Sequence, residues 1–359
     1  MPVILDRGPA GYGLFGPQPI AAPSSSRAIE VALINNMPDS ARKATEEQFA
    51  TLLTRAAGDM FVRVRLFSLA GGEPGDACSR QAYPPIGRLW DSKVDALIVT
   101  GTEPRAAALP DEPYWSTLTR LVDWAERSTI STIWSCLAAH AAVLHRDGIR
   151  RRALPQKRSG LFEFDNTSDH ALMTGMPARF IVPHSRQNDL HESDLTSCGY
   201  GVLSRSADAG VDTFVKDSRS TFVFFQGHPE YTAETLFREY RRDVARFLKL
   251  EKDAYPAMPV GYFSAEMRNR LMAFRRRALA RPNPDALADF PILADQPAKS
   301  WSRPAARFYR NWLVSISQQK AARTGGIAES FQRSRRPPGI TASRPPRASG
   351  AARSQDAGT

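Results

Sequence analysis

Short apolar runs alternate with helix-like stretches along the first half of this 359-residue chain. The runs are mostly apolar and β-branched, have the length of strands, and occupy residues 29–36, 61–69, 94–101 and 131–134. Stretches with apolar side chains at helical spacing follow them, at 37–58, at 114–127 and after residue 136. Strands that alternate with helices favour a mostly parallel sheet with helices on both faces. We therefore expect an α/β fold whose site lies where neighbouring strands end.

After residue 150 the pattern becomes that of a more antiparallel patch, made of short β-branched segments separated by turns. An aromatic strand and a helix follow, then a proline-rich irregular stretch that holds one basic helix, and finally a last ordered helix. We expect these four elements at residues 220–231, 233–250, 264–280 and 300–316. Residues 29–318 are expected to form one domain, preceded by an irregular segment at 1–28.

The formal net charge of +11 is concentrated near the C-terminus. Residues 320–359 hold eight Lys and Arg against Glu329 and Asp356, so about half of the excess lies there. Because this stretch is rich in Pro, Gly, Ser and Ala and has no apolar period, we expect 319–359 to be a basic, disordered tail. A dedicated role in nucleic-acid binding is therefore not expected. No apolar run reaches the roughly 18 residues that a membrane span needs.

The three cysteines, Cys78, Cys136 and Cys198, lie far apart and form no Cys-x-x-Cys pair. This spacing argues against a disulfide framework and against a metal site, and it favours a reducing cytoplasm. No secretory signal is recognisable at the N-terminus, where Asp6 and Arg7 interrupt a short apolar patch.

Cys136 is the first candidate for chemistry. It stands between the strand-like "STIW" and the helix-like "LAAHAAVLH", so its thiol lies at the N-terminus of a helix. The free N–H groups there favour a thiolate and are able to stabilise an oxyanion. Ala138 and Ala139 allow the close packing that a nucleophile on a strand-to-helix turn requires. A buried cysteine that only fills space is the alternative, and this stretch alone does not separate the two.

His228 is the candidate base among the six histidines. It follows the aromatic strand in "FFQGHPEY", and Pro229 sets the exit of the chain. Glu230, two residues on, is placed to accept a hydrogen bond from the imidazole ring. A cysteine, a histidine and a carboxylate would supply the nucleophile, base and orienting group of a triad. His140, one turn after Cys136, is expected to pack in the interior instead.

Two related families share a cysteine followed by His-x-Glu in this order. The class I glutamine amidotransferases have an elbow Gly-x-Cys-x-Gly and a His-Pro-Glu, but "WSCLA" has no glycine on either side of Cys136. The wider resemblance is to the homoserine O-acyltransferases, which use succinyl or acetyl donors. Segments that resemble this family's signatures occur in order: "NNMPDSARKATEEQFATLL", "LIVTG" with "PYW", "KRSGLFEF", "PHSR" and "GHPEYTAETLFREYRRD". With "SWSRPAARFYRNWL", which is similar to the family's C-terminal end, the resemblance covers roughly residues 29–316.

The resemblance implies a flavodoxin-like fold, as in class I glutamine amidotransferases, and acyl transfer to the hydroxyl of L-homoserine in methionine biosynthesis. It makes Cys136 the nucleophile that takes the acyl group from acyl-CoA, His228 the base and Glu230 its orienting group. It places four further residues in the substrate pocket: Lys157, Ser185, Glu239 and Arg242. It also implies a homodimer and no cofactor apart from acyl-CoA as a co-substrate. Glu239 and Arg242 suit an amino-acid substrate, because Glu binds an ammonium and Arg grips a carboxylate.

Arg105 marks a departure from the family pattern. It lies where the family carries a Gly or Glu that sorts succinyl from acetyl donors. A cation there would pair with a succinyl carboxylate, which favours succinyl-CoA, or would occupy the space that a succinyl chain needs. Acetyl-CoA as donor, serine as acceptor and a glutamine-hydrolysing activity remain the alternatives.

Overall fold

The computed structural model describes residues 3–6, 12–15, 28–69, 83–84, 86–293 and 300–334. The chain divides into two compact units, Met1–Lys320 and Ala321–Thr359, and the first holds the elements discussed below apart from the C-terminal part of α9 (Ser302–Ser334). A Gly- and Pro-rich stretch at 71–92 falls largely outside the described residues, although α3 (Gly87–Trp90) lies near its end.

A nine-stranded sheet runs through the described part of the first unit. Its five central pairings, from β1 to β13, are parallel, and antiparallel strands close both edges. This topology confirms the predicted α/β fold with a mostly parallel sheet. Across the sheet the strands are β2 (Tyr12–Phe15), β1 (Val3–Asp6), β4 (Val62–Phe67), β3 (Ile29–Ile34), β5 (Ala96–Val99), β6 (Ser131–Ser135), β13 (Thr221–Phe225), β12 (Thr213–Asp217) and β9 (Gly201–Val202).

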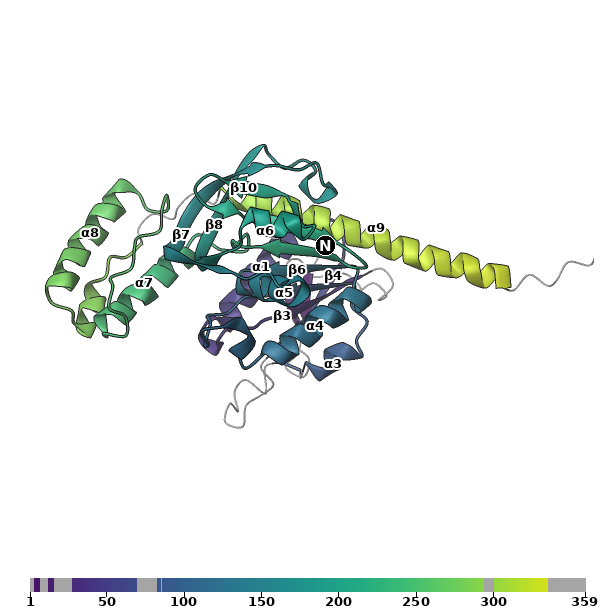
Figure 1. Ribbon diagram of the computed structural model, residues 1–359, viewed down its shortest axis with the longest axis horizontal. Coiled ribbons are helices and arrows are strands. Elements are labelled where there is room, and N and C mark those ends of the chain that lie inside the picture. The colour runs from purple at the N-terminus through teal and green to yellow at the C-terminus, as the bar shows by residue number, and fades with distance from the viewer. Residues whose placement is uncertain are drawn as a thin grey trace, which may run out of the picture. The chain divides into compact units, whose positions relative to one another are not determined.

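Helices cover both faces of this sheet because side chains alternate along each buried strand. On β3, Val31 and Leu33 join the apolar core that contains α1 (Asp39–Ala57) and the first part of α9 (Ser302–Ser334). Ala32 and Ile34 join the opposite core, which contains α4 (Trp115–Ser128) and α5 (Leu137–Asp147). Figure 1 shows α4 and α5 side by side, together with α3, on that face.

The antiparallel patch expected after residue 150 is a second sheet of four strands in order β11-β10-β7-β8. Its long hairpin pairs β7 (Arg152–Asn166) with β8 (Arg179–Asp189). The shorter strands β10 (Ser204–Ser206) and β11 (Gly210–Val211) extend it, and α6 (Glu192–Ser197) follows β8. This hairpin carries Lys157 and Ser185 on its two strands.

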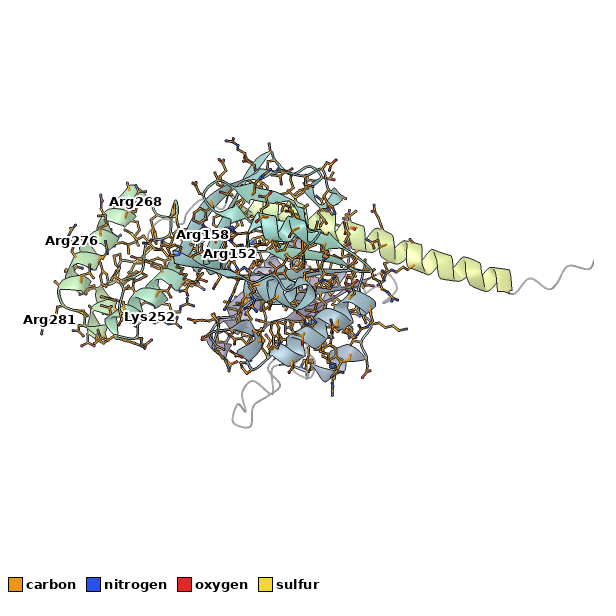
Figure 2. All side chains as sticks on the ribbon, in the orientation of Figure 1. Arg152, Arg158, Lys252, Arg268, Arg276 and Arg281 are labelled. Atoms are coloured by element: carbon orange, nitrogen blue, oxygen red, sulfur yellow. The ribbon has the colours of Figure 1, made fainter. Side chains whose placement is uncertain are left out.

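A third apolar core joins α7 (Thr235–Leu248), α8 (Ala265–Ala280) and Phe290. The predicted basic helix is thus present as α8, and Ser264 caps it by accepting a hydrogen bond from the N–H of Met267 at 3.2 Å. Figure 1 shows α7 and α8 next to each other, and Figure 2 shows the side chains of Arg268, Arg276 and Arg281 along α8.

This small lobe is fastened to β7 at Gly160. The backbone of Val260 bonds on both sides of that glycine, to Ser159 O at 2.9 Å and from Leu161 N at 2.8 Å. Gly160 has φ +143°, and a β-carbon on it would lie 2.4 Å from the N and O atoms of Val260. Only glycine allows the two chains to approach so closely.

Two boundaries differ from the sequence prediction. The segment 1–28, expected to be irregular, contains β1 and β2, and β1 pairs in parallel with β4. The pairing partner of β1 is more than fifty residues away, so its short apolar run alone did not reveal it. The tail was expected to begin at 319, but α9 continues to Ser334. Residues 335–359 lie outside the described residues.

Candidate active site

Cys136 occupies a sharp turn between β6 and α5. Its backbone has φ 53° and ψ −115°, and only Leu250 among the other described non-glycine residues also has a positive φ. Such a conformation is strained for a residue with a side chain and persists only when its surroundings hold it. The Cys136 N–H donates to Phe225 O on β13 at 2.7 Å, and the Cys136 carbonyl accepts from His140 N at 3.2 Å. The thiol thus lies at the carboxyl end of the parallel sheet, on a strand-to-helix turn like that of a nucleophile elbow.

Gly101 brings the neighbouring loop against this turn. It follows β5, which pairs in parallel with β6. A β-carbon on Gly101 would lie 3.0 Å from Leu137 N, 3.1 Å from Ser135 O and 3.3 Å from Cys136 Cβ. The absence of a side chain therefore lets the loop after β5 reach the N-terminus of α5. The sequence prediction that strand ends gather around the cysteine is confirmed.

His228 and Glu230 follow β13, the other neighbour of β6. His228 Nδ1 is hydrogen-bonded to Glu230 Oε1 at 2.8 Å, and the two side chains are 12% and 6% exposed. The ring of Tyr231 stacks on the imidazole with a centroid distance of 4.1 Å. Burial lowers the pKa of His228, but the charges of Glu230 and Cys136, with hydrogen bonds to both, raise it well above its ordinary value. The structure thus brings all three predicted catalytic residues together.

Glu239 is the centre of the predicted substrate residues. Its Oε2 accepts a hydrogen bond from Ser185 Oγ, and its Oε1 accepts one from Tyr231 Oη at 2.6 Å. Lys157 Nζ lies 3.9 Å from Glu239 Oε2 and 2.7 Å from Asp243 Oδ2. Lys157, Ser185 and Glu239, which come from β7, β8 and α7, therefore form one charged cluster beside His228.

Sequence reasoning missed Tyr231 and Asp243, although both stand inside segments that carried the resemblance. Burial tends to raise the pKa of Asp243, but Lys157 and Arg242 outweigh it and hold this pKa below its usual value. Arg242 contacts Asp243 Oδ1 from Nη2 at 3.0 Å, and the Arg242 side chain stays 46% exposed. Arg242 thus lies at the rim of the cluster, with its neighbour Asp243 linking it to Lys157.

Arg105 is placed differently from the other predicted residues. Its side chain is exposed, while its backbone N–H donates to Glu112 Oε1 at 2.9 Å. The same oxygen accepts the N–H of Ala106 at 3.1 Å, so Glu112 fixes the loop that follows Gly101. Glu103 in this loop pairs with Arg246 of α7 at 2.5 and 2.8 Å. Arg105 therefore lies outside the cluster formed by Lys157, Ser185 and Glu239.

Two buried histidines lie outside the triad. His140 bonds to Gln226 Oε1 through Nε2 at 3.0 Å, and burial lowers its pKa to about 3, so the predicted packing role is confirmed. His184 lies 3.3 Å from Asp212 Oδ1, and burial lowers its pKa to about 4 despite that carboxylate. Gly227 packs on this pair, because a β-carbon there would lie 2.7 Å from both His184 Nε2 and Asp212 Oδ1.

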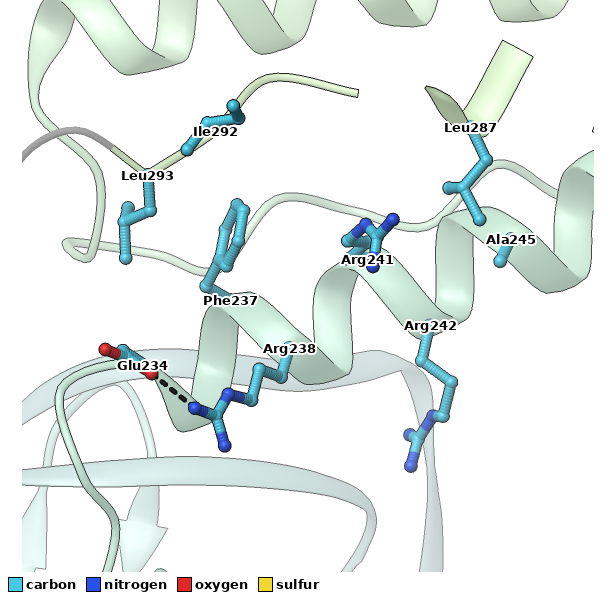
Figure 3. A pocket seen from close by; sticks show the side chains of 9 residues that line it. All are labelled: Glu234, Phe237, Arg238, Arg241, Arg242, Ala245, Leu287, Ile292 and Leu293. Carbon is cyan, nitrogen blue, oxygen red and sulfur yellow. Dashed lines mark hydrogen bonds and ion pairs between the residues drawn. The ribbon is translucent and has the colours of Figure 1, made fainter. Parts of the chain in front are cut away.

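A separate cavity of about 450 Å³ opens on α7 (Figure 3). Phe237 and Arg241 point toward the segment with Ile292 and Leu293, while Arg238 and Arg242 leave α7 on another side. Arg238 is paired with Glu234 at 2.5 Å. The cavity is thus apolar in part, and its lining includes three arginines, of which Arg241 points toward Ile292 and Leu293.

Within the described ranges, no group of three or more His, Cys, Asp and Glu residues is arranged to hold a metal ion. No helix in the same ranges is long and apolar enough to cross a membrane.

The fold and the site define a class: an α/β enzyme with a cysteine on a nucleophile elbow and a His–Glu pair beside it. The family model described as homoserine O-succinyltransferase matches residues 17–322. The homoserine O-succinyltransferase of Rhodopseudomonas palustris is 48% identical over 301 residues, which are 82% of this chain and 90% of that protein. That of Methylorubrum extorquens is 47% identical over 323 residues, 88% of this chain and 94% of the relative. The chain belongs to the homoserine O-succinyltransferase family and is an acyltransferase.

Among solved structures, a glutamine amidotransferase from Thermotoga maritima is similar to this chain. It is 13% identical, with a TM-score of 0.46, and the match covers 80% of this chain and 98% of that one. At this distance the likeness says nothing about activity.

Proposed function

We propose that this enzyme transfers the succinyl group of succinyl-CoA to the hydroxyl of L-homoserine, a step of methionine biosynthesis. The observation that carries the proposal is the Cys136–His228–Glu230 arrangement in a chain of this family. Cys136, His228 and Glu230 are proposed as the catalytic residues. Neither reactant requires a cofactor for this chemistry.

The first half-reaction forms an acyl-enzyme. The raised pKa of His228 supports a resting imidazolium beside Cys136. The Cys136 thiolate attacks the thioester carbonyl, and N–H groups near Leu137 and the Gly101 turn stabilise the oxyanion. The carbon–sulfur bond to CoA breaks, and His228 gives its proton to the leaving CoA thiolate. The products are a succinyl thioester on Cys136, free CoA and a neutral His228.

The second half-reaction consumes the thioester. Neutral His228 takes the proton of the homoserine hydroxyl, whose oxygen attacks the Cys136 thioester carbonyl. The tetrahedral intermediate collapses, the bond to Sγ breaks, and O-succinyl-homoserine leaves. The thiolate and imidazolium are thereby restored, which completes a two-step mechanism with ping-pong kinetics. Glu230 keeps Nδ1 occupied, so that the other ring nitrogen faces the reacting atoms.

Homoserine is proposed to bind at the charged cluster around Glu239. The Glu239 carboxylate suits the α-ammonium group, and the exposed Arg242 is free to turn from Asp243 to the α-carboxylate. Lys157 and Ser185 line the same pocket and keep Glu239 in place. These contacts are made to the α-ammonium and α-carboxylate groups, which homoserine and serine share. The length of the acceptor's own side chain therefore decides between the two substrates.

The cavity on α7 supports CoA as the carrier of the acyl group. The donor's nucleotide end combines an aromatic base with several phosphates. Phe237 and Leu293 offer an apolar surface, and Arg241 beside them offers the positive charge that phosphates require (Figure 3). We place Arg105 at the edge of the donor path, on the loop that Glu112 fixes.

The test is intact-mass spectrometry of the enzyme after mixing with succinyl-CoA. A covalent succinyl group adds roughly 100 Da, the mass expected if a thiol is the nucleophile. We expect this adduct on the wild type and its absence on Cys136→Ala. An unlabelled wild type, or full activity of Cys136→Ala, would overturn the mechanism.

The substrate specificity is measured by assaying acetyl-CoA and succinyl-CoA, each with homoserine and with serine. Release of glutamate from glutamine tests for hydrolase activity.

Two further expectations accompany the proposal. A thiolate nucleophile works only while it is reduced, which supports the cytoplasmic location that the cysteine spacing predicts. The homodimer is tested by light scattering, which should give twice the mass of one chain. A monomer that is fully active would contradict it.

A further inference from the structure

Arg151 is a partly buried cation near the active site, and the mechanism above does not use it. It lies in the link between α5 and β7. Its Nη1 atom is buried and has no hydrogen-bond partner among the described residues. Burial lowers the pKa of Arg151, whereas Tyr114, Glu112 and the thiolate of Cys136 act in the opposite direction. A guanidinium thus stands within electrostatic reach of the nucleophile with donor capacity unused.

Two neighbours of Arg151 are also incompletely paired. Tyr114 Oη and Glu112 Oε2 are buried and have no hydrogen-bond partner in the described part of the chain. Tyr114 packs in the same apolar core as Leu137, which follows the nucleophile, and Ile149, which precedes Arg151 by two residues. Buried polar atoms almost always have a hydrogen-bond partner. Three neighbouring atoms without one therefore indicate that a bound ligand group pairs with them.

The acyl group that Cys136 carries has the chemistry that such unpaired donors would bind. A succinyl thioester ends in a carboxylate two methylene groups beyond its carbonyl, whereas an acetyl thioester ends in a methyl group. Arginine binds a carboxylate through two parallel N–H donors, and a tyrosine hydroxyl is able to add a third. Glu112 is oriented by its other oxygen, which accepts the N–H groups of Arg105 and Ala106.

We propose that Arg151, together with Tyr114, binds the distal carboxylate of the acyl group on Cys136 and thereby selects succinyl over acetyl donors. This inference rests on the proposed function and makes Arg151, rather than Arg105, the main determinant of the donor. The Arg105 side chain is exposed, where water weakens an ion pair, whereas Arg151 Nη1 is screened from water. The competing role for Arg151 is that of a purely structural counter-ion to Glu112.

The test compares kcat/KM for succinyl-CoA and acetyl-CoA in Arg151→Gln and Tyr114→Phe, with homoserine as acceptor. We expect Arg151→Gln to lower the succinyl-to-acetyl ratio by about a hundredfold, and Tyr114→Phe to lower it by about tenfold. Arg150→Gln is the matched control, because it removes the same charge from the exposed adjacent position. Single-turnover acylation, followed by intact mass, should show the same change in ratio.

If Arg151 were only a structural counter-ion, Arg151→Gln would lower kcat/KM equally for succinyl-CoA and acetyl-CoA. A ratio within about twofold of the wild type in Arg151→Gln therefore overturns the inference. If that variant does not fold, Tyr114→Phe and Arg151→Lys, which keeps the charge but loses the planar fork, decide by the same ratio. If the wild type forms no acyl-enzyme with either donor, the proposed function fails. If the wild type transfers succinyl but the variants keep its ratio, only the present inference fails.

Discussion

Gly101 and Cys136 touch across the ends of two adjacent strands: a β-carbon on the glycine would lie 3.3 Å from that of the cysteine. The closer neighbours of that position are backbone atoms, Leu137 N at 3.0 Å and Ser135 O at 3.1 Å, which do not rotate away. The strained turn of Cys136 is therefore supported by a loop that has no side chain at the contact. The position of the thiol depends on both segments.

We expect Gly101→Ala to slow acylation of Cys136 by about tenfold with little loss of fold, because the turn must shift by a few tenths of an ångström. Rapid mixing with succinyl-CoA and intact-mass detection measures this rate. Gly87→Ala is the control, since nothing lies within 4 Å of the β-carbon it adds. An acylation rate equal to that of the wild type would show that the contact does not position the nucleophile.

Replacing Glu230 by Gln should move the acid limb of the pH–rate profile to lower pH. Transfer to homoserine needs a neutral His228, so the rate falls as the pH falls through the His228 pKa. That pKa is raised above 6.5 by the charge of Glu230 among other groups, so removing this charge lowers it. The variant should also lose roughly hundredfold or more in kcat, because the ring is no longer oriented.

The measurement is kcat as a function of pH for the wild type, Glu230→Gln and the exposed control Glu163→Gln. Glu163→Gln should leave the inflection in place. An inflection that moves to higher pH in Glu230→Gln would contradict the assigned charge of the pair.

Stability should fall in mild acid because His140 and His184 are buried in their neutral forms. Their pKa values are lowered to about 3 and about 4, while an unfolded histidine titrates near 6.5. Between pH 6.5 and about 4, only the unfolded chain binds these protons, so each residue lowers the free energy of unfolding by about 1.4 kcal/mol per pH unit.

Urea unfolding between pH 7.5 and 5 measures this slope. His140→Gln should reduce the slope of the unfolding free energy against pH by the contribution of one bound proton. His191→Gln, at an exposed position, should change that slope little. Equal slopes in His140→Gln and the wild type would mean that His140 is not held neutral.

Glu239→Gln should raise KM for homoserine by about tenfold or more, because a neutral amide no longer attracts the α-ammonium. Acylation of Cys136 by succinyl-CoA should persist, since homoserine is absent from that step. Steady-state kinetics and the mass assay separate the two effects. Glu251→Gln, at an exposed position just after α7, is the matched control. A loss confined to acylation would exclude Glu239 from the acceptor site.

Arg241→Gln should raise KM for succinyl-CoA several-fold if the cavity on α7 receives the phosphates. The same variant should use succinyl-pantetheine, a donor without the nucleotide, as well as the wild type does. Arg276→Gln on the exposed side of α8 is the charge-matched control (Figure 2). Equal losses with both donors would place Arg241 outside nucleotide binding.

The period of apolar residues predicted the parallel sheet well, because burial on both faces leaves a direct trace in the sequence. Cys136 was located by its place between a strand and a helix, and His228 and Glu230 by the His-Pro-Glu segment after a strand. Periodicity does not report which distant side chains meet. Asp243 and Arg151 were missed for this reason, because their partners Lys157 and Tyr114 come from other elements. The strand β1 was missed because its partner β4 is distant in the chain.

Gly160 fixes where the lobe of α7 and α8 attaches to β7. The lobe of α7 and α8 meets β7 at Val260, and that meeting exists because one carbon atom is missing from residue 160. Exchanges within 251–293 that keep this contact are therefore expected to leave β7, and with it Lys157, in place. An engineer who wishes to vary this lobe has a single glycine to preserve.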